Sequence, residues 1–106
     1  PDEMLLMGLS AGADGGIGST YNYQMPYIKA VYDSFKAGDM AAALDAQRRA
    51  DAVIRVLHKY KTIPASKAIL EARGFAVGNA VFPQVRYTAE EKAAIVADFR
   101  AAGLPI

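Results

Sequence analysis

The sequence predicts a mostly helical chain with one short strand, an α/β arrangement in which the strand's partners lie outside these 106 residues. Helical patterns cover about five segments, and a single glycine-rich segment has the composition of a strand. No second segment reads as a strand. A lone buried strand would leave its backbone hydrogen-bonding groups unpaired, so we expect its neighbours to come from elsewhere.

The balance of charges and the order of residues exclude several functional classes. Twelve Lys+Arg residues accompany eleven Asp+Glu residues, so the formal net charge of +1 offers no electrostatic basis for nucleic-acid binding. No run approaches the roughly 20 apolar residues of a membrane span, and the first residues lack the pattern of a signal peptide. We therefore expect a cytoplasmic chain that binds neither nucleic acid nor membrane.

The scarcity of metal-binding residues predicts a site without metal or cofactor. The chain has no cysteine, and His58 is its single histidine, so a metal site would depend mostly on carboxylates. The chain also begins with Pro1 and enters an apolar stretch almost at once. This start leads us to expect a piece of a longer polypeptide.

The N-terminal residues predict a buried helix followed by the strand. Residues 2–11 begin with two acidic residues and are then apolar on nearly every side, and Gly12 is placed to end the helix. Residues 14–19 hold three glycines around Ile17. That composition suits a short strand whose backbone closely approaches a neighbour.

Helical spacing dominates the middle of the chain. Apolar residues recur at the i, i+3, i+4, i+7 spacing across residues 25–37, and Pro26 fits the first turn of that helix. Gly38 and Asp39 combine a C-cap glycine with an N-cap aspartate, which predicts a tight corner. A long amphipathic helix is expected after it, over residues 40–60.

Two shorter helices complete the chain. Residues 66–73 predict a helix that Gly74 ends, and residues 75–86 are expected to form a loop because they contain Gly, Asn and Pro. Thr88 and Glu91 have the spacing of a capping box. They predict the start of a last helix.

Asp2 and Glu3 are the first candidate site residues. Adjacent carboxylates in a first turn interact favourably with the helix dipole, which is a sufficient structural reason for them. The two oxygens of each carboxylate can also accept hydrogen bonds from the hydroxyl groups of a polyol or sugar. Ser19, at the end of the glycine-rich segment, offers a further hydroxyl. The residues alone therefore indicate a hydroxylated ligand near these three positions.

The remaining candidates favour structural roles. Residues 15–20 match neither the P-loop nor the dinucleotide-binding fingerprint. His58 lies near the end of the long helix beside basic residues, a position typical of a solvated residue. Lys67 is expected to point outward, and Tyr21 and Tyr23 are expected to pack at an element boundary.

One long run of the sequence resembles the C-terminal part of the N-acetylneuraminate lyases, the sialic acid aldolases. It reads DEMLLMGLSAGADGGIGSTYN from Asp2 to Asn22, and the later Gly38-Asp39 corner and SKAIL segment at 66–70 are similar to the continuation of that family. These lyases are class I aldolases related to dihydrodipicolinate synthase. The resemblance implies the closing portion of a (β/α)8 TIM barrel, from the end of strand seven to helix eight, plus a C-terminal helical extension.

The resemblance also implies a division of the chain. Residues 1–37 would be the end of the barrel, with helix seven, strand eight and helix eight, and residues 38–106 would be the helical extension. Residues 14–19 would be strand eight, whose C-terminal end faces the active site of such a barrel. The neighbouring strands would belong to the N-terminal part of the same barrel, and the complete enzyme would be a homotetramer.

The functional implication concerns substrate binding. In this family the positions of Asp2, Glu3 and Ser19 bind the glycerol-like tail of sialic acid, which agrees with the polyol interpretation. The complete enzyme would cleave N-acetylneuraminate to N-acetylmannosamine and pyruvate through a lysine Schiff base. That lysine would precede Pro1, so no catalytic residue is assigned here. An aldolase for another 2-keto-3-deoxy sugar acid and a catalytically silent helical fragment or interaction module are the alternatives.

Overall fold

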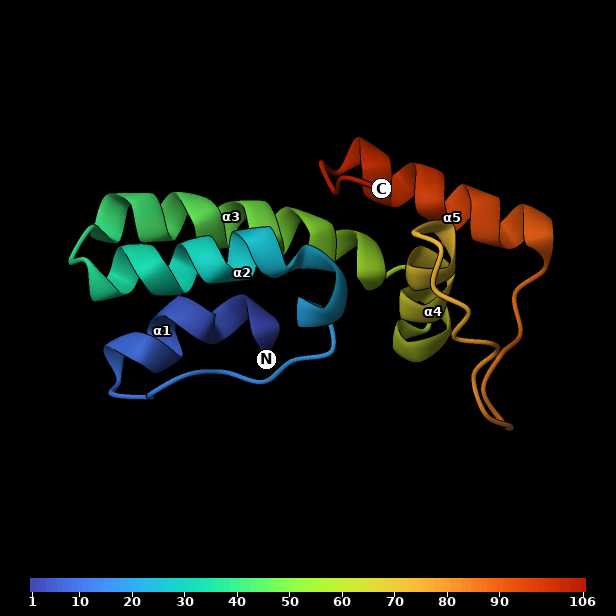
Figure 1. The fold of residues 1–106 in the computed structure, drawn as a ribbon, viewed down its shortest axis with the longest axis horizontal. Coiled ribbons are helices and arrows are strands. Elements are labelled where there is room, and N and C mark those ends of the chain that lie inside the picture. The colour runs from blue at the N-terminus through green and yellow to red at the C-terminus, as the bar shows by residue number, and fades with distance from the viewer. The chain divides into compact units, whose positions relative to one another are not determined.

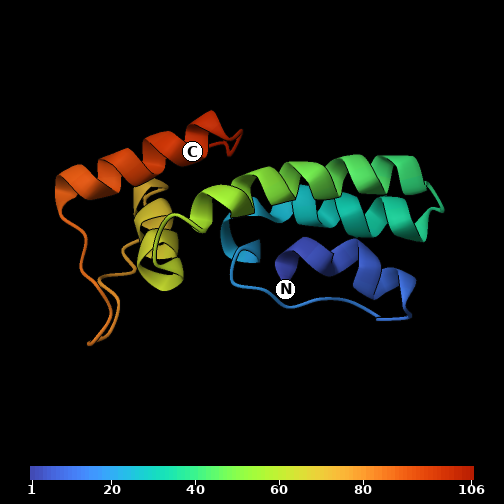
Figure 2. The same ribbon diagram turned by 180° about the vertical axis from the view of Figure 1, so that it is seen from behind.

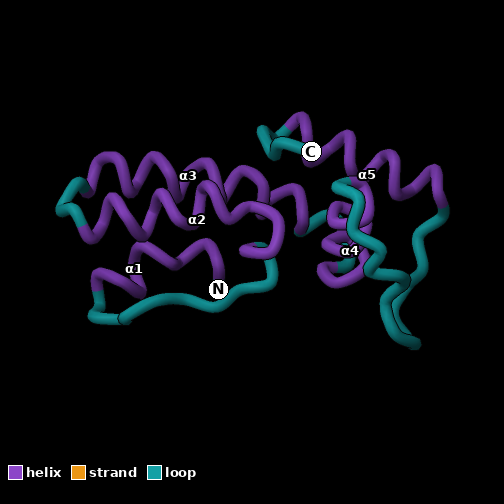
Figure 3. Tube along the Cα trace, in the orientation of Figure 1, coloured by secondary structure: helices purple, strands orange, loops and turns teal.

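The computed structural model describes residues 1–106, and its regular elements are all helical (Figure 3). A 3₁₀ helix η1 (Asp2–Met4) precedes α1 (Leu5–Ser10), α2 (Tyr21–Lys36), α3 (Met40–Leu57), α4 (Thr62–Ala72) and α5 (Ala89–Ala101). The chain divides into two compact units, Pro1–Ile54 and Arg55–Ile106, which are described separately below.

The first unit is a layer of three helices packed around one apolar core. Figure 1 shows α1 and α2 running in the same direction and α3 returning beside α2, an arrangement that Figure 2 shows from behind. Small side chains on α3 let the helices approach closely, because alanine adds little volume at the contact. The buried core is built from Leu5, Leu6, Leu9, Ile28, Val31, Ala43, Ala46 and Ala50.

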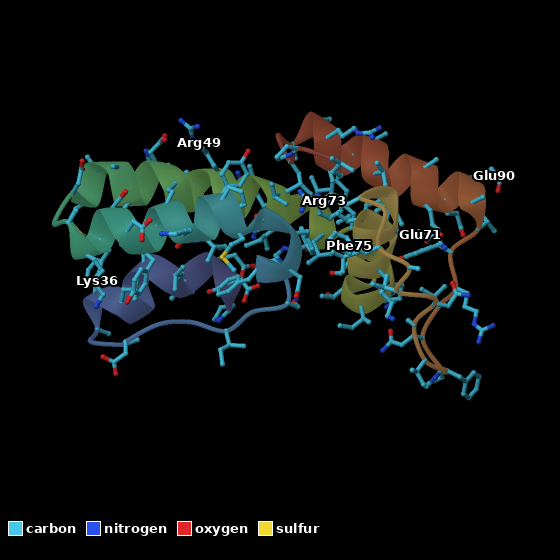
Figure 4. The ribbon with its side chains drawn as sticks, viewed as in Figure 1. Lys36, Arg49, Glu71, Arg73, Phe75 and Glu90 are labelled. Carbon is cyan, nitrogen blue, oxygen red and sulfur yellow. The ribbon has the colours of Figure 1, made fainter.

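The long helix α3 is amphipathic, as the sequence predicts. Arg49 points away from the layer into solvent (Figure 4), where it forms an ion pair of 2.8 Å with Asp45 one turn earlier. The corner before α3 also matches its prediction. Gly38 has a φ of 77°, and the side chain of Asp39 accepts a hydrogen bond from the backbone N–H of Ala42.

Helix α2 begins earlier than expected and is kinked. Its first turn starts at Tyr21, and Gln24 leaves the helical conformation with φ −120° and ψ 26°. The kink precedes Pro26, which has no N–H to donate to an earlier carbonyl. The helix predicted over residues 25–37 is therefore the part of α2 that follows the kink. Lys36 lies near the end of α2 (Figure 4), with its ammonium 5.3 Å from the centroid of the Tyr32 ring.

The strand expected at residues 14–19 is not formed. These residues return along α1 as an open segment (Figure 1), and no backbone hydrogen bond joins residues 14–17 to another extended segment. A strand is defined by its hydrogen-bonded ladder, and this chain supplies no second strand to form one. The expectation of close backbone approach, in contrast, is confirmed at Gly16 and Gly18.

The second unit contains α4, α5 and the loop between them. The two helices pack against each other, and Glu71 of α4 forms an ion pair of 2.7 Å with Lys92 of α5. Helix α4 begins at Thr62 rather than at residue 66, so Pro64 lies in its first turn, where proline is tolerated. Figure 2 shows the predicted loop leaving α4 and returning to α5.

The last helix starts as predicted. The Thr88 side chain accepts a hydrogen bond from the backbone N–H of Glu91, and the Glu91 carboxylate accepts one from the backbone N–H of Thr88. This reciprocal pair satisfies two N–H groups that the first turn of a helix leaves unbonded. The expected division of the chain between residues 37 and 38 concerns a complete barrel and stays a prediction.

Candidate functional site

The carboxylate of Asp2 lies at the start of α2. Its Oδ2 atom accepts two hydrogen bonds from Thr20, one from the backbone N–H at 3.1 Å and one from the side-chain hydroxyl at 2.6 Å. Asp2 comes from η1, and Thr20 ends the glycine-rich segment 18 residues later. These bonds therefore bring together the two ends of residues 2–20, which include η1, α1 and the glycine-rich segment.

Gln24 fixes the direction of these hydrogen bonds. Its side-chain Nε2 donates to the hydroxyl oxygen of Thr20 at 2.8 Å, and its side chain is fully buried at the kink of α2. An ionised carboxylate only accepts hydrogen bonds, so the single hydroxyl proton of Thr20 points to Asp2. The oxygen of Thr20 is then left to accept from Gln24, which gives a directed chain from Gln24 through Thr20 to Asp2.

Gln47 of α3 holds the backbone of the same turn. Its Oε1 accepts from the N–H of Leu6 at 3.0 Å, and its Nε2 donates to the carbonyl of Asp2 at 3.3 Å and to Asp51 Oδ1 at 2.8 Å. The Gln47 side chain is buried. The position of Asp2 is thus set at its backbone by α3 and at its carboxylate by the start of α2.

The glycines of the segment allow two close approaches. A Cβ atom added to Gly18 would overlap the carboxylate of Asp2, with 2.5 Å to Cγ. One added to Gly16 would come within 2.9 Å of Leu5 Cδ1 and of the Tyr21 hydroxyl. Neither glycine has a positive φ, so both are required by the space available rather than by backbone conformation.

The three predicted site residues occupy one corner of the first unit. Glu3 is adjacent to Asp2 in η1 and is half-buried, and Ser19 is exposed and directly precedes Thr20. The backbone carbonyl of Ser19 accepts a hydrogen bond from Asn22 Nδ2 at 3.0 Å. Two neighbouring carboxylates and a serine hydroxyl therefore lie at the junction between η1 and α2. This arrangement can accept and donate hydrogen bonds to a hydroxylated ligand.

An open groove of about 500 Å³ adjoins this corner. Asp2 lines it, whereas Glu3 and Ser19 do not, and much of its wall is apolar. Met7 is 61% exposed, and Ile17 is fully exposed. The lining runs along α1 and the glycine-rich segment and includes Met4, Leu5, Met7, Gly16, Ile17 and Tyr21.

The pKa of Tyr21 depends on its partial burial and on the charge of Asp2. Partial burial raises the pKa of the Tyr21 phenol above its ordinary value of 10.0, and the nearby negative charge of Asp2 raises that pKa further. Both effects disfavour the phenolate. Tyr21 therefore stays neutral at physiological pH and packs beside the segment, as expected for a boundary tyrosine.

The other candidates take structural positions. Lys67 donates to the backbone carbonyl of Val77 at 2.8 Å, which ties α4 to the loop that follows and replaces the outward orientation expected for it. His58 is exposed just after α3. No group of three or more His, Cys, Asp or Glu side chains is placed to hold a metal ion. No helix has the length and apolar character needed to cross a membrane.

Three residues of this corner, Thr20, Gln24 and Gln47, were not among the predicted site residues. Thr20 stands in the resembling run but has no pattern that identifies its partner. Gln24 and Gln47 lie among apolar residues on helix faces. That position indicates a buried amide, which needs hydrogen-bond partners. Two partners of Gln47, Asp2 and Leu6, lie more than 40 residues away in the sequence, so the sequence does not identify them.

Comparison with known proteins gives consistent matches. A family model described as the dihydrodipicolinate synthetase family matches residues 1–102. An N-acetylneuraminate lyase of Rhizobium meliloti (strain 1021) is 42% identical over 77 residues, which are 73% of this chain and 26% of that protein. One of Lactiplantibacillus plantarum is 34% identical over 96 residues, which are 91% of this chain and 33% of that protein.

A solved structure shows the same arrangement. The N-acetylneuraminate lyase of Proteus mirabilis matches with a TM-score of 0.88 and 36% identity, over 99% of this chain and 36% of that one. The chain therefore spans between about a quarter and about a third of the length of these relatives.

Proposed function

Because the chain belongs to the dihydrodipicolinate synthetase family, we propose that it forms the sugar-recognition part of a class I aldolase that cleaves N-acetylneuraminate to N-acetylmannosamine and pyruvate. The three relatives described above are N-acetylneuraminate lyases, which supports this reaction over others of the family. The observation that carries the proposal is the corner where Thr20 holds Asp2 beside Glu3 and Ser19.

The three residues would bind the part of the substrate that does not react. Carboxylate oxygens of Asp2 and Glu3 accept hydrogen bonds from the hydroxyl groups of the glycerol-like tail, and the Ser19 hydroxyl can donate or accept one. Holding the tail orients the bond to be broken, which lowers the entropic part of the barrier. The nucleophilic lysine that forms the Schiff base with the keto group would lie outside this chain.

The apolar groove supports a further part of the proposal. Exposed Met7 and Ile17 fit contact with the rest of a TIM barrel better than contact with a polyol. In the complete barrel, residues 14–19 would lie between neighbouring strands as strand eight, and their end would reach the active site. We further propose that the complete enzyme is cytoplasmic and a homotetramer. Gel filtration with light scattering tests the number of subunits.

The reaction is tested on the complete enzyme with a panel of 2-keto-3-deoxy sugar acids. We expect pyruvate release to be fastest from N-acetylneuraminate, because its tail fits the polyol-binding corner. Borohydride added with pyruvate should trap a covalent adduct, which mass spectrometry should place on a lysine outside residues 1–106. Faster cleavage of another acid, or an adduct on Lys61 or Lys67, would contradict the proposal.

A further inference from the structure

The hydrogen-bond chain from Gln24 through Thr20 to Asp2 has a property that the proposed function does not use. Both donors of Thr20 meet the same carboxylate oxygen, Oδ2, at 3.1 Å and 2.6 Å. Neither bond involves the other oxygen, Oδ1, which lies on the side of the carboxylate that faces Gly18. The carboxylate is therefore anchored through Oδ2, and Oδ1 takes no part in that anchor.

We propose that Thr20 is a positioning residue that anchors Oδ2 of Asp2 and so presents Oδ1 to a ligand hydroxyl; this inference rests on the proposed sugar-binding role of Asp2. A carboxylate without this anchor would rotate about its side-chain bonds and lose orientation before each binding event. Two hydrogen bonds to one oxygen leave little freedom for that rotation, because charge-assisted bonds are short and directional.

Gln24 and Gly18 support the same arrangement. The Oε1 atom of Gln24 is buried without a hydrogen-bond partner, whereas its Nε2 donates to Thr20. The opposite orientation of this amide would let Oε1 accept the hydroxyl proton that Asp2 receives. Gly18 lies against Oδ1, and a Cβ at that position would cover the oxygen. Gln24 thus sets the direction of the Thr20 hydroxyl, and Gly18 leaves Oδ1 without a Cβ atom against it.

The test compares Thr20→Val with Thr20→Ser in the complete enzyme. Valine keeps the shape of threonine and removes the hydroxyl donor, so we expect KM for N-acetylneuraminate to rise about tenfold. Serine restores the donor and should return KM to within about threefold of the original enzyme. Trapping of the pyruvate adduct by borohydride should be unchanged in both, because that step does not involve the sugar tail.

The control is Thr88→Val, which removes the hydroxyl that caps α5 in the second unit. It should lower the melting temperature and leave KM unchanged. If Thr20→Val lowers the melting temperature and also leaves KM unchanged, Thr20 is a structural cap and the inference is overturned. Should Thr20→Val not fold, Gln24→Leu tests the same chain: a raised KM supports the inference and an unchanged KM overturns it.

A double-mutant cycle separates this inference from the proposed function. In an Asp2→Ala background, Thr20→Val should have no further effect on KM, because the residue it positions is gone. If Asp2→Ala raises KM but Thr20→Val has the same effect with and without Asp2, the positioning role alone is wrong. If Asp2→Ala itself leaves KM unchanged, the proposed role of Asp2 is wrong, and the inference is overturned with it.

Discussion

Asp2 and Thr20 illustrate how a single residue contact organises this corner. The two residues lie 18 positions apart in sequence, and their side chains meet at 2.6 Å. The acidic pair suggested only a favourable charge at the start of a helix or a polyol ligand. The structure adds that the same carboxylate accepts the N–H of the residue that precedes α2. Asp2 therefore stabilises a second helix start through one of its oxygens, Oδ2.

The close approach of Asp2 to Gly18 can be tested by substitution at Gly18. Gly18→Ala places a methyl group against the carboxylate of Asp2, and we expect it to destabilise the fold by about 1–3 kcal/mol. Gly15→Ala is the matched control, because an added Cβ there has no atom within 4 Å and its φ is not positive. Urea unfolding of both variants of the complete protein measures the difference. Equal stability of the two would show that Asp2 does not approach Gly18.

At the scale of elements, helix boundaries were predictable wherever a local signal sets them. The capping box at Thr88 and the positive φ of Gly38 and Gly74 ended or began helices as the sequence indicated. Helices α2 and α4 begin earlier than predicted: α2 has an extra turn before its kink at Gln24, and α4 begins at Thr62, before the predicted start at residue 66. Pro64 fits the first turn of α4, whereas Pro26 lies beyond the first turn of α2 and follows its kink.

The glycine-rich segment shows why contacts between distant parts of the chain could not be predicted from the sequence. Its composition correctly indicated close backbone approach at Gly16 and Gly18, yet a strand also needs a partner that this chain does not contain. The binding role of the predicted site residues stays a prediction. Residue type and resemblance named Asp2, Glu3 and Ser19, whereas Gln47 bonds Asp2 from 45 positions away, a distance that no local pattern spans.

A second prediction at this scale concerns the hydrogen bond between Tyr60, in the turn after α3, and Asp98 of α5. The Tyr60 hydroxyl donates to Asp98 Oδ2 at 2.7 Å, and this hydrogen bond, followed by slight burial and the charge of Asp98, raises the pKa of Tyr60 above 10.0. A raised pKa favours the neutral phenol in the folded state. Its contribution to stability is therefore present below pH 10 and is lost as the pH rises through the folded pKa.

Asp98→Ala should remove this shift. We expect the Tyr60 pKa to fall towards 10.0 and the loss of stability above pH 10 to become smaller. Ultraviolet titration of tyrosinate measures the pKa, and Tyr60→Phe identifies which part of the titration belongs to Tyr60. An unchanged titration in Asp98→Ala would mean that the hydrogen bond does not form in solution.

At the scale of the whole molecule, the groove and the polar corner beside it differ in chemistry. The polar corner at Asp2 and Glu3 suits a hydroxylated ligand, whereas exposed Met7 and Ile17 suit apolar contact. Under the proposed function these surfaces belong to one barrel, in which the polar corner faces the active site. The helical second unit would extend that barrel, and its loop and capped helix need no part in the chemistry.

The most direct test of this account compares two substrates in the original enzyme and in Asp2→Ala. One substrate is N-acetylneuraminate, and the other is a 2-keto-3-deoxy sugar acid that lacks the glycerol-like tail. We expect the original enzyme to prefer N-acetylneuraminate, and Asp2→Ala to reduce that preference in kcat/KM by about tenfold or more, because a hydrogen bond to a charged group is lost. A preference unaltered by Asp2→Ala would contradict the account.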